Sequence, residues 1–359
     1  MKRKPRIAYL LQMFGIGGMP KWLYNLAGEL QAEFEFTFIA THSSYVREEY
    51  RQVARLATLP FNKWVLAAYL KARRIDLAQV ANLHRYTKAA RLARVPVVIE
   101  RTDGLRSGAA LNSKEGLDLV VASTRGVVPH LEPLIAPEKI RVIYNGINVE
   151  AFEGVKPQRF GFGGDDVVIG RTSRLAGGKN ISLLIQALIE LRKDANYRHV
   201  RLVVCGGDNT QRGAQPMLAT LKAEAAPLAE SVMFTGEVFD TRAITLGYDI
   251  ATCTSRPHNE GIPNSLIEAM GAAVPVVATA VDDIPELVAD GESGLLVPSD
   301  DVAELAKALK RLIDDETLRR RMGAAGKARV EADFSLPIQA RKYADLYWEL
   351  LKQKGVNGV

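Results

Sequence analysis

Short apolar runs alternate with longer helical segments along this chain, and the alternation occurs in two series. In the first half, near-continuous hydrophobic runs at residues 6–11, 36–40 and 77–81 are typical of strands that helices cover on both faces. The alternation restarts with an apolar run at residues 167–170 and continues to a helical segment at 302–314. Because strands that alternate with helices form parallel sheets, the sequence predicts two doubly wound α/β domains.

A stretch rich in proline and glycine lies between the two series and predicts the linker. Residues 152–164 contain Pro157 and four glycines. We therefore expect an N-terminal Rossmann-like domain over residues 1–152 and a C-terminal Rossmann-like domain over residues 165–333. We expect a final helix, residues 334–359, to pack back toward the N-terminal domain. A length of 359 residues fits two domains of about 100–200 residues each.

Composition excludes several classes of protein. Hydrophobic residues make up 47% of the chain and charged residues 25%, which excludes a mainly disordered chain and a disulfide scaffold. The two cysteines, Cys205 and Cys253, lie in apolar runs, so we expect buried thiols in a reducing compartment. No run approaches the roughly 18 apolar residues of a membrane span, and the apolar run after the basic N-terminus is broken by Gln12 and then by glycines. We expect a cytoplasmic protein.

Positive charge is concentrated in the first half of the chain. Residues 1–150 hold 22 basic and 13 acidic residues, and residues 63–94 hold eight basic residues and one acid, Asp76. A basic half suits an anionic partner such as a membrane surface, a phosphorylated acceptor or nucleic acid, and it equally suits a solvated helix face. Residues 61–71 could form a basic amphipathic helix on an anionic membrane. In the alternative, Trp64, Leu66 and Leu70 of this segment pack in the core.

Glycine-rich turns follow predicted strands, and ligands of open parallel sheets bind at the carboxyl ends of strands. The turn at residues 15–18 is no dinucleotide fingerprint, because Pro20 stands where the third glycine would be. In the loop at 172–180, Arg174 and Lys179 lie five residues apart, so both could reach one diphosphate. The turn at 205–208 contains Gly206 and could form part of a nucleotide pocket. Each of these loops could also be a simple turn with solvated charges.

Residues 255–270 carry the strongest functional signal. Glu260 is predicted in a loop, and Glu268 in a helix that begins near Pro263 or Asn264. The loop carboxylate could reach a sugar while the helical carboxylate faces a ribose. The free N–H groups of Asn264, Ser265 and Leu266 at the start of the helix could hold a phosphate. The alternative, two unrelated surface carboxylates, fits poorly with the Gly-Ile-Pro-Asn segment between them.

With these motifs, nearly the whole chain resembles the family-four retaining glycosyltransferases of bacterial type. That family has the GT-B architecture, in which two Rossmann-like domains face each other across a cleft. The matching segments are Gly17-Gly18, residues 143–148, Ser173-Arg174-Leu175 with Lys179, residues 260–263 with Glu268-Ala269-Met270, residues 275–279, and residues 285–297.

The resemblance implies roles for the matching residues. Arg174 and Lys179 would bind the donor diphosphate, Glu268 the nucleotide ribose, and Glu260 the transferred sugar. The other donor-binding positions would be Gly17, Gly18, Gly206, Gly261, Ile262, Pro263, Asn264, Ser265 and Leu266.

Three departures from the family pattern bear on donor selectivity. The family histidine after the strand at residues 96–100 is absent, and Asp103 is the nearest polar substitute. Asp282-Asp283 stands where members often have two glycines, and Ala273 stands where a glycine is usual.

The function implied is transfer of a sugar, with retention, from a nucleotide-diphosphate sugar of the UDP or GDP type. The acceptor would be a sugar, a glycolipid or another small molecule, in cell-envelope polysaccharide, glycolipid or other glycoconjugate synthesis. We expect the protein to use no cofactor or metal and to bind no nucleic acid. We expect it to lie at the inner face of a membrane. Two alternatives stay open: a nucleotide-sugar epimerase of the same architecture, and a basic membrane- or nucleic-acid-binding protein without catalysis.

Overall fold

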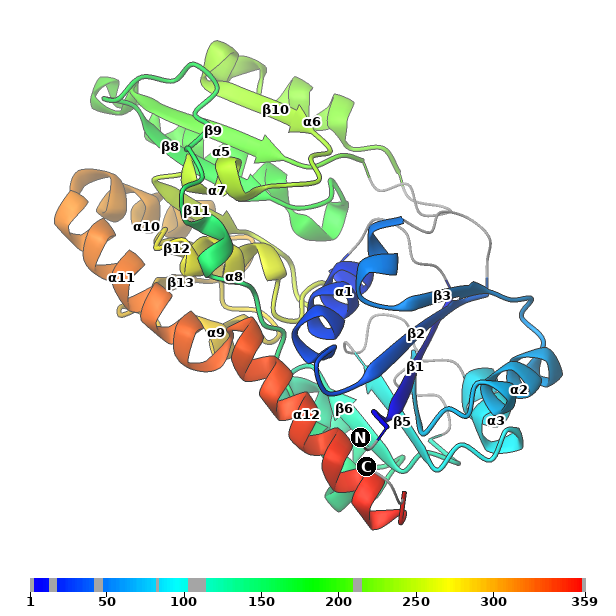
Figure 1. Ribbon diagram of the computed structural model, residues 1–359. Coiled ribbons are helices and arrows are strands. Elements are labelled where there is room, and N and C mark those ends of the chain that lie inside the picture. Colours follow the sequence, from blue (N-terminus) through cyan, green and yellow to red (C-terminus); the bar gives the residue numbers. More distant parts are fainter. Residues whose placement is uncertain are drawn as a thin grey trace. The chain divides into compact units, whose positions relative to one another are not determined.

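The chain divides into two compact units in the computed structural model, which describes residues 3–12, 18–41, 48–81, 84–102, 114–208 and 215–356. The first unit comprises Met1–Gly146 together with Leu336–Val359, and the second comprises Ile147–Ser335. The first unit is therefore built from both ends of the chain, as the blue and red ribbons of Figure 1 show. Among the described residues, no helix has the length and apolar character needed to cross a bilayer.

The first unit contains a seven-stranded parallel sheet with the order β3-β2-β1-β4-β5-β6-β7. Its strands are β1 (Arg6–Leu11), β2 (Glu35–Ala40), β3 (Arg55–Thr58), β4 (Leu77–Ala81), β5 (Val97–Thr102), β6 (Leu119–Ala122) and β7 (Ile140–Val142). Its α-helices are α1 (Gly18–Leu30), α2 (Lys63–Ala72), α3 (His84–Leu92), α4 (Val128–Leu131) and α12 (Leu336–Gln353).

Alternate residues of β1, β2, β4, β5 and β6 pack in two separate cores. Tyr9 of β1 packs in a core with residues of α1 and α12, whereas Leu10 packs in the core that includes residues of α2 and α3. This alternation is the period-two pattern of a strand covered on both faces. The buried hydroxyls of Tyr9 and Tyr347 lie 2.8 Å apart, and Tyr347 donates to Gln79 over 2.7 Å. Helix α12 is thus tied to the central strands β1 and β4.

The second unit contains a six-stranded parallel sheet with the order β10-β9-β8-β11-β12-β13. Its strands are β8 (Val167–Thr172), β9 (Val200–Cys205), β10 (Val232–Gly236), β11 (Ile250–Cys253), β12 (Val276–Thr279) and β13 (Leu295–Val297). Its α-helices are α5 (Ile181–Leu191), α6 (Leu218–Glu224), α7 (Arg242–Leu246), α8 (Asn264–Gly271), α9 (Ile284–Leu287), α10 (Val302–Asp314) and α11 (Glu316–Asp333).

Side-chain caps account for several helix starts. Asn62 caps α2 by accepting from the backbone N–H groups of Trp64 and Val65, at 2.9 and 3.4 Å. Asp301 and Asp315 cap α10 and α11 in the same way. Such caps satisfy N–H groups that have no partner inside the helix, and they fix where each helix begins.

Two doubly wound parallel sheets confirm the predicted fold class. The boundary between the units lies at Gly146 and Ile147, earlier than the expected linker at 152–164. Residues of that stretch contact the second unit instead: the N–H of Gln158 donates to the carbonyl of Ala243 over 2.8 Å, and Arg159 pairs with Asp249 over 3.1 Å.

Candidate active site in the second unit

The loops that carry the predicted site residues meet at one edge of the second sheet. The strand order reverses beside β8, which has β9 on one side and β11 on the other. The loops that follow β8, β11 and β12 leave the sheet at the carboxyl ends of these strands. This point of reversal is where open α/β sheets bind their ligands.

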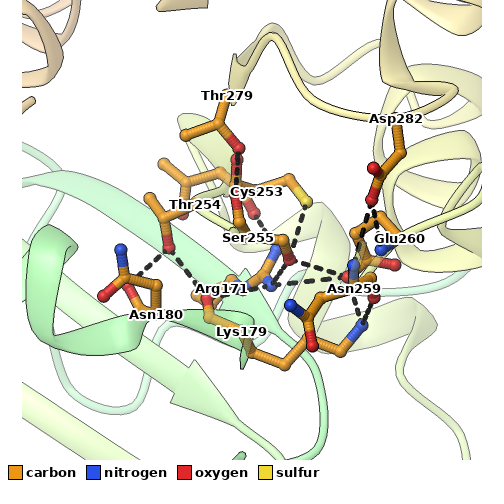
Figure 2. Close-up of polar contacts among 11 residues, drawn as sticks. Arg171, Lys179, Asn180, Cys253, Thr254, Ser255, Asn259, Glu260, Thr279 and Asp282 are labelled. Atoms are coloured by element: carbon orange, nitrogen blue, oxygen red, sulfur yellow. Dashed lines mark hydrogen bonds and ion pairs between the residues drawn. The ribbon is translucent and has the colours of Figure 1, made fainter. Parts of the chain in front are cut away.

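Lys179 and Glu260 form an ion pair at this edge. The Lys179 ammonium contacts Oε1 of Glu260 and also donates to the carbonyl of Asn259 over 3.2 Å. The Ser255 hydroxyl donates to the same Oε1 over 2.7 Å. Both charged side chains are largely buried, with 13% of Lys179 and 6% of Glu260 exposed. Figure 2 shows the two side chains directed toward each other from neighbouring loops.

A second cation, Arg171, lies buried beside this pair. Its side chain is only 1% exposed, and its Nη2 atom lies 3.9 Å from Oε1 of Glu260. Nη1 donates to the carbonyl of Thr252, and Nη2 to the hydroxyl of Ser255, each over 3.1 Å. A buried charge is costly unless it is paired and hydrogen-bonded, and the Glu260 carboxylate lies here between two cations and a hydroxyl donor. Arg171 was not predicted from the sequence, although an arginine in an otherwise apolar strand indicates a buried charge that needs a partner.

Glycine lets the two main loops of the site approach closely. The N–H of Arg256 donates to the carbonyl of Gly178 over 3.0 Å. A Cβ atom on Gly178 would lie 1.9 Å from Oδ1 of Asn259, so any other residue there would displace the Asn259 side chain. The Thr254 hydroxyl adds a hydrogen bond to the carbonyl of Asn180 over 2.9 Å. The loop after β8 and the loop after β11 are therefore joined by hydrogen bonds.

Arg174 lies on a different part of the loop after β8 and has an exposed side chain. The N–H of the preceding Ser173 donates to the carbonyl of Cys205 over 2.9 Å, so this part of the loop runs beside the end of β9. Gly206 has a φ of +141°, and a Cβ atom there would lie 1.9 Å from the carbonyl oxygen of Ser173. Gly206 therefore permits the backbone of Ser173 to pass close to the end of β9.

Glu268 lies on α8, and its side chain is half-buried. The Thr241 hydroxyl donates to Oε2 of Glu268 over 3.3 Å. Burial raises the pKa of the Cys205 thiol, and the charge of Glu268 raises it further.

The start of α8 differs in one respect from the expectation. Helix α8 begins at Asn264, but the N–H of Leu266 donates to the carbonyl of Pro263 over 3.0 Å. That N–H is therefore engaged in the first turn of the helix and is not the free donor that we predicted. Leu266 is buried, whereas the remaining predicted positions are half-buried: Gly261, Ile262, Pro263, Asn264 and Ser265.

Only some of the predicted site residues of the first unit lie in the described part of the chain. Gly17 and Asp103 lie outside the described residues, and α1 begins at Gly18. Within the described ranges, no three or more His, Cys, Asp or Glu side chains gather in a group that could hold a metal ion.

Comparison with known proteins identifies relatives among glycosyltransferases. Residues 166–315 match the family described as glycosyl transferases group 1. The alpha-maltose-1-phosphate synthase of Mycobacterium tuberculosis is 29% identical over 309 residues, covering 79% of this chain and 76% of that enzyme. The enzyme of the same name from Mycolicibacterium smegmatis is 28% identical over 253 residues, which span 65% of this chain and 63% of that enzyme. The phosphatidyl-myo-inositol mannosyltransferase of Mycobacterium leprae is 33% identical over 189 residues, covering 51% of this chain and 47% of that enzyme.

Solved structures share the fold over almost the whole chain. A glycosyltransferase from Rickettsia africae has a TM-score of 0.82 and 19% identity, covering 97% of this chain and 99% of that one. Anabaena Alr3699/HepE in complex with UDP-glucose has a TM-score of 0.79 and 20% identity, covering 96% and 99%. The two doubly wound sheets thus define a protein of the GT-B class. Within that class, residues 166–315 match the group 1 glycosyl transferases, a family similar to the one that the sequence resembles.

Proposed function

We propose that this protein is a family-four retaining glycosyltransferase that uses a nucleotide-diphosphate sugar. The observation that carries the proposal is the paired Lys179 and Glu260, held with Arg171 at the point where the strand order reverses. Two cations and one carboxylate leave this cluster with a net positive charge. A donor with a diphosphate complements that charge, because developing negative charge on the leaving group is stabilised by fixed cations.

In the proposed reaction, the bond between the anomeric carbon and the diphosphate oxygen breaks, and a bond to the acceptor oxygen forms on the same face of the sugar. The leaving phosphate oxygen takes the proton of the acceptor hydroxyl, so no separate protein base is needed. Arg174, Lys179 and backbone N–H groups at the start of α8 stabilise the leaving diphosphate. One well-placed donor of this kind contributes about 2.7–4 kcal/mol to lowering the barrier. We propose that these groups act without a metal ion or cofactor.

The other site residues orient the donor. Glu268 accepts hydrogen bonds from the ribose, and Glu260 contacts the transferred sugar, while Gly206 leaves room for the nucleotide. A UDP or GDP nucleotide is our proposal for the donor; Anabaena Alr3699/HepE, which shares the fold, has been crystallised with UDP-glucose. We propose a sugar, a glycolipid or another small acceptor, and a role in envelope polysaccharide or other glycoconjugate synthesis. The comparisons favour neither the epimerase nor the binding-protein alternative.

Helix α2 supports a contact with an anionic membrane. Leu66 and Leu70 are buried in the core, but Trp64 is 63% exposed and Val65 is 40% exposed. The alternative, in which all three side chains pack in the core, is confirmed for Leu66 and Leu70 and wrong for Trp64. The Lys63 ammonium lies 5.2 Å from the centre of the Trp64 ring, so an aromatic group and a cation share one surface. We propose that this surface brings the protein to the cytoplasmic face of a membrane, where cations and aromatic groups both favour binding.

The test is a donor screen followed by product analysis. UDP-, GDP-, ADP- and dTDP-sugars are compared by thermal shift, because a ligand that binds the folded state raises apparent stability. Each sugar that raises the melting temperature is then incubated with the protein, and released nucleoside diphosphate is measured. A transferase releases it; an epimerase leaves the sugar on the nucleotide, and a binding protein leaves the donor intact. Retention is then read from the anomeric configuration of the product by NMR.

A further inference from the structure

One carboxylate, that of Asp282, binds three consecutive backbone N–H groups of the loop that carries Glu260. Oδ1 accepts from His258 over 2.8 Å, and Oδ2 accepts from Asn259 over 3.0 Å and from Glu260 over 2.9 Å. Asp282 follows β12, whereas the three donors follow β11, so this contact joins two loops of the candidate site. Figure 2 shows Asp282 reaching the Glu260 loop on the side opposite Thr254 and Asn180.

The backbone on both sides of this contact has an uncommon conformation. His258 has a φ of +62° and Asp282 a φ of +49°, in the left-handed region that residues other than glycine seldom adopt. A left-handed residue in a short loop can turn successive N–H groups toward one point, which creates a small anion-binding hollow. In this protein, that hollow is filled by the Asp282 side chain of the same chain.

The contact bears directly on the orientation of Glu260. Its backbone N–H is held by Asp282, while its carboxylate is held by Ser255 and Lys179. The backbone and the side chain of Glu260 are therefore fixed from two directions. Hydrogen bonds to a charged acceptor are stronger than neutral ones, so removal of the Asp282 carboxylate frees three donors at once. The loop then loses the contact that fixes the direction of Glu260.

We propose that Asp282 is a positioning residue, which sets the orientation of Glu260 for sugar transfer without touching the substrate. This inference rests on the proposed function, in which Glu260 contacts the transferred sugar. Because Glu268 and Arg174 hold the nucleotide in that proposal, Asp282 controls turnover and has little effect on nucleotide affinity. A small displacement of an orienting group can lower a rate about 100-fold, since productive alignment of the reacting atoms is lost.

The test uses the full chain with Asp282→Gly and Asp282→Asn. Glycine removes the carboxylate and adopts the left-handed backbone without strain, so the fold is retained. Asparagine keeps one carbonyl acceptor and should give an intermediate effect. Asp315→Asn is the matched control, because Asp315 also accepts a backbone N–H, from Leu318 over 2.8 Å, at the start of α11.

Three measurements are made on each variant. Hydrogen exchange, followed by mass spectrometry, reports the amides of His258, Asn259 and Glu260. Turnover and KM are measured with whichever of UDP-glucose or the other screened nucleotide sugars the wild type converts, and affinity is measured with the matching nucleoside diphosphate. We expect these amides to exchange about tenfold faster in Asp282→Gly, and kcat to fall about 10- to 100-fold, with nucleotide affinity within twofold of wild type.

The outcomes separate this inference from the proposed function. If Asp282→Gly keeps full turnover, or if it loses turnover only in proportion to nucleotide affinity, Asp282 is not a positioning residue for transfer. An equal loss of turnover in Asp315→Asn would also overturn the inference, because a general effect on the fold would then suffice. If the wild type converts no nucleotide sugar, the proposed function fails, while faster exchange in Asp282→Gly would still show that the loop is held by this contact.

Discussion

The Lys179 ammonium contacts the Glu260 carboxylate directly, although the sequence pattern gives these two residues different tasks. Lys179 is expected at the diphosphate and Glu260 at the sugar. In the folded chain, Glu260 pairs with the ammonium and holds it in place inside a largely buried site. Arg171, 3.9 Å from the same carboxylate oxygen, supplies a further positive charge, so the cluster stays cationic. A donor diphosphate would meet a lysine already oriented by its carboxylate partner.

Removing either proposed phosphate-binding cation should slow the chemical step. We expect Lys179→Ala and Arg174→Ala each to lower kcat about 100-fold at saturating donor, because charge on the leaving group then develops without its cation. The measurement is release of nucleoside diphosphate at saturating donor. Lys193→Ala is the control, since Lys193 pairs with Glu190 on an exposed helix end. Full turnover in both site variants would show that the loop is only structural.

A chelator should leave wild-type turnover unchanged. The proposed reaction relies on Arg174, Lys179 and backbone N–H groups for charge stabilisation. The check is kcat before and after dialysis against EDTA, with and without added Mg²⁺ or Mn²⁺. Loss of activity that a metal ion restores would contradict metal-independent transfer.

Glu268 should control nucleotide affinity. Glu268→Gln replaces a charge-assisted acceptor by a neutral one, so we expect the affinity for the nucleoside diphosphate to fall about tenfold. Isothermal titration calorimetry with the nucleotide chosen by the donor screen measures the change. Glu316→Gln, at an exposed pair with Arg320, is the matched control. Equal affinities of wild type and Glu268→Gln would contradict the assignment of Glu268 to the ribose.

Arg171 should contribute strongly to stability. Arg171→Met leaves Glu260 with fewer partners in a buried site, and breaking such a charged network costs about 3 kcal/mol. Urea unfolding gives the change in the free energy of unfolding. Arg320→Met, which removes an exposed ion pair, should cost less than about 1 kcal/mol. Comparable values for the two variants would mean that Arg171 is no essential partner of Glu260.

Asp118 should make the stability of the protein depend on pH. Burial acts to raise its pKa, but hydrogen bonds from Lys354, the Val98 N–H and Arg91 outweigh burial and lower the pKa below its ordinary value of 3.8. A carboxyl with a lowered folded-state pKa stabilises the fold above its unfolded-state pKa, and this contribution is lost as pH falls through the folded-state value. We expect Asp118→Asn to cost about 1–2 kcal/mol at pH 7 and progressively less below pH 3.8. Urea unfolding across this range checks the trend, and a cost independent of pH would contradict it.

The exposed surface of α2 should bind anionic vesicles in a salt-sensitive way. We expect wild type to sediment with phosphatidylserine-containing vesicles at low salt and to be released at high salt, because screening weakens exposed charges. Lys63→Ala with Lys71→Ala should weaken binding by about 1 kcal/mol per cation, and Trp64→Ala should weaken it further. Neutral vesicles and Lys193→Ala serve as controls. Equal, negligible binding to both vesicle types would leave only a solvated helix face.

Local pattern was enough to predict most of the strands. The apolar runs at residues 6–11 and 77–81 have the bounds of β1 and β4, because a strand covered on both faces is largely apolar. Strand β3 was missed, since Arg-Leu-Ala-Thr contains no continuous apolar run and lies at the edge of its sheet. Helix α11 was also not among the predicted elements.

The contacts of the candidate site could not be predicted from local pattern. Lys179 and Glu260 lie 81 positions apart along the chain, and only the order of strands brings them together. The same holds for Asp282, which was noted as a departure from a family pattern and proved to bind the Glu260 loop. The sequence motifs thus predicted loops that meet at one edge of the sheet, whereas the pairing among their side chains depends on tertiary structure.

The hydrogen bond between Tyr9 and Tyr347 also constrains the order in which the chain can fold during synthesis. Tyr347 and Tyr343 belong to the core that contains β1, yet they are translated after the whole of the second unit. The second unit is continuous in sequence, so it can complete its core on the ribosome. The apolar face of the first unit that α12 covers stays exposed until residue 351 has emerged from the ribosome. Its nascent form therefore depends longest on protection from aggregation.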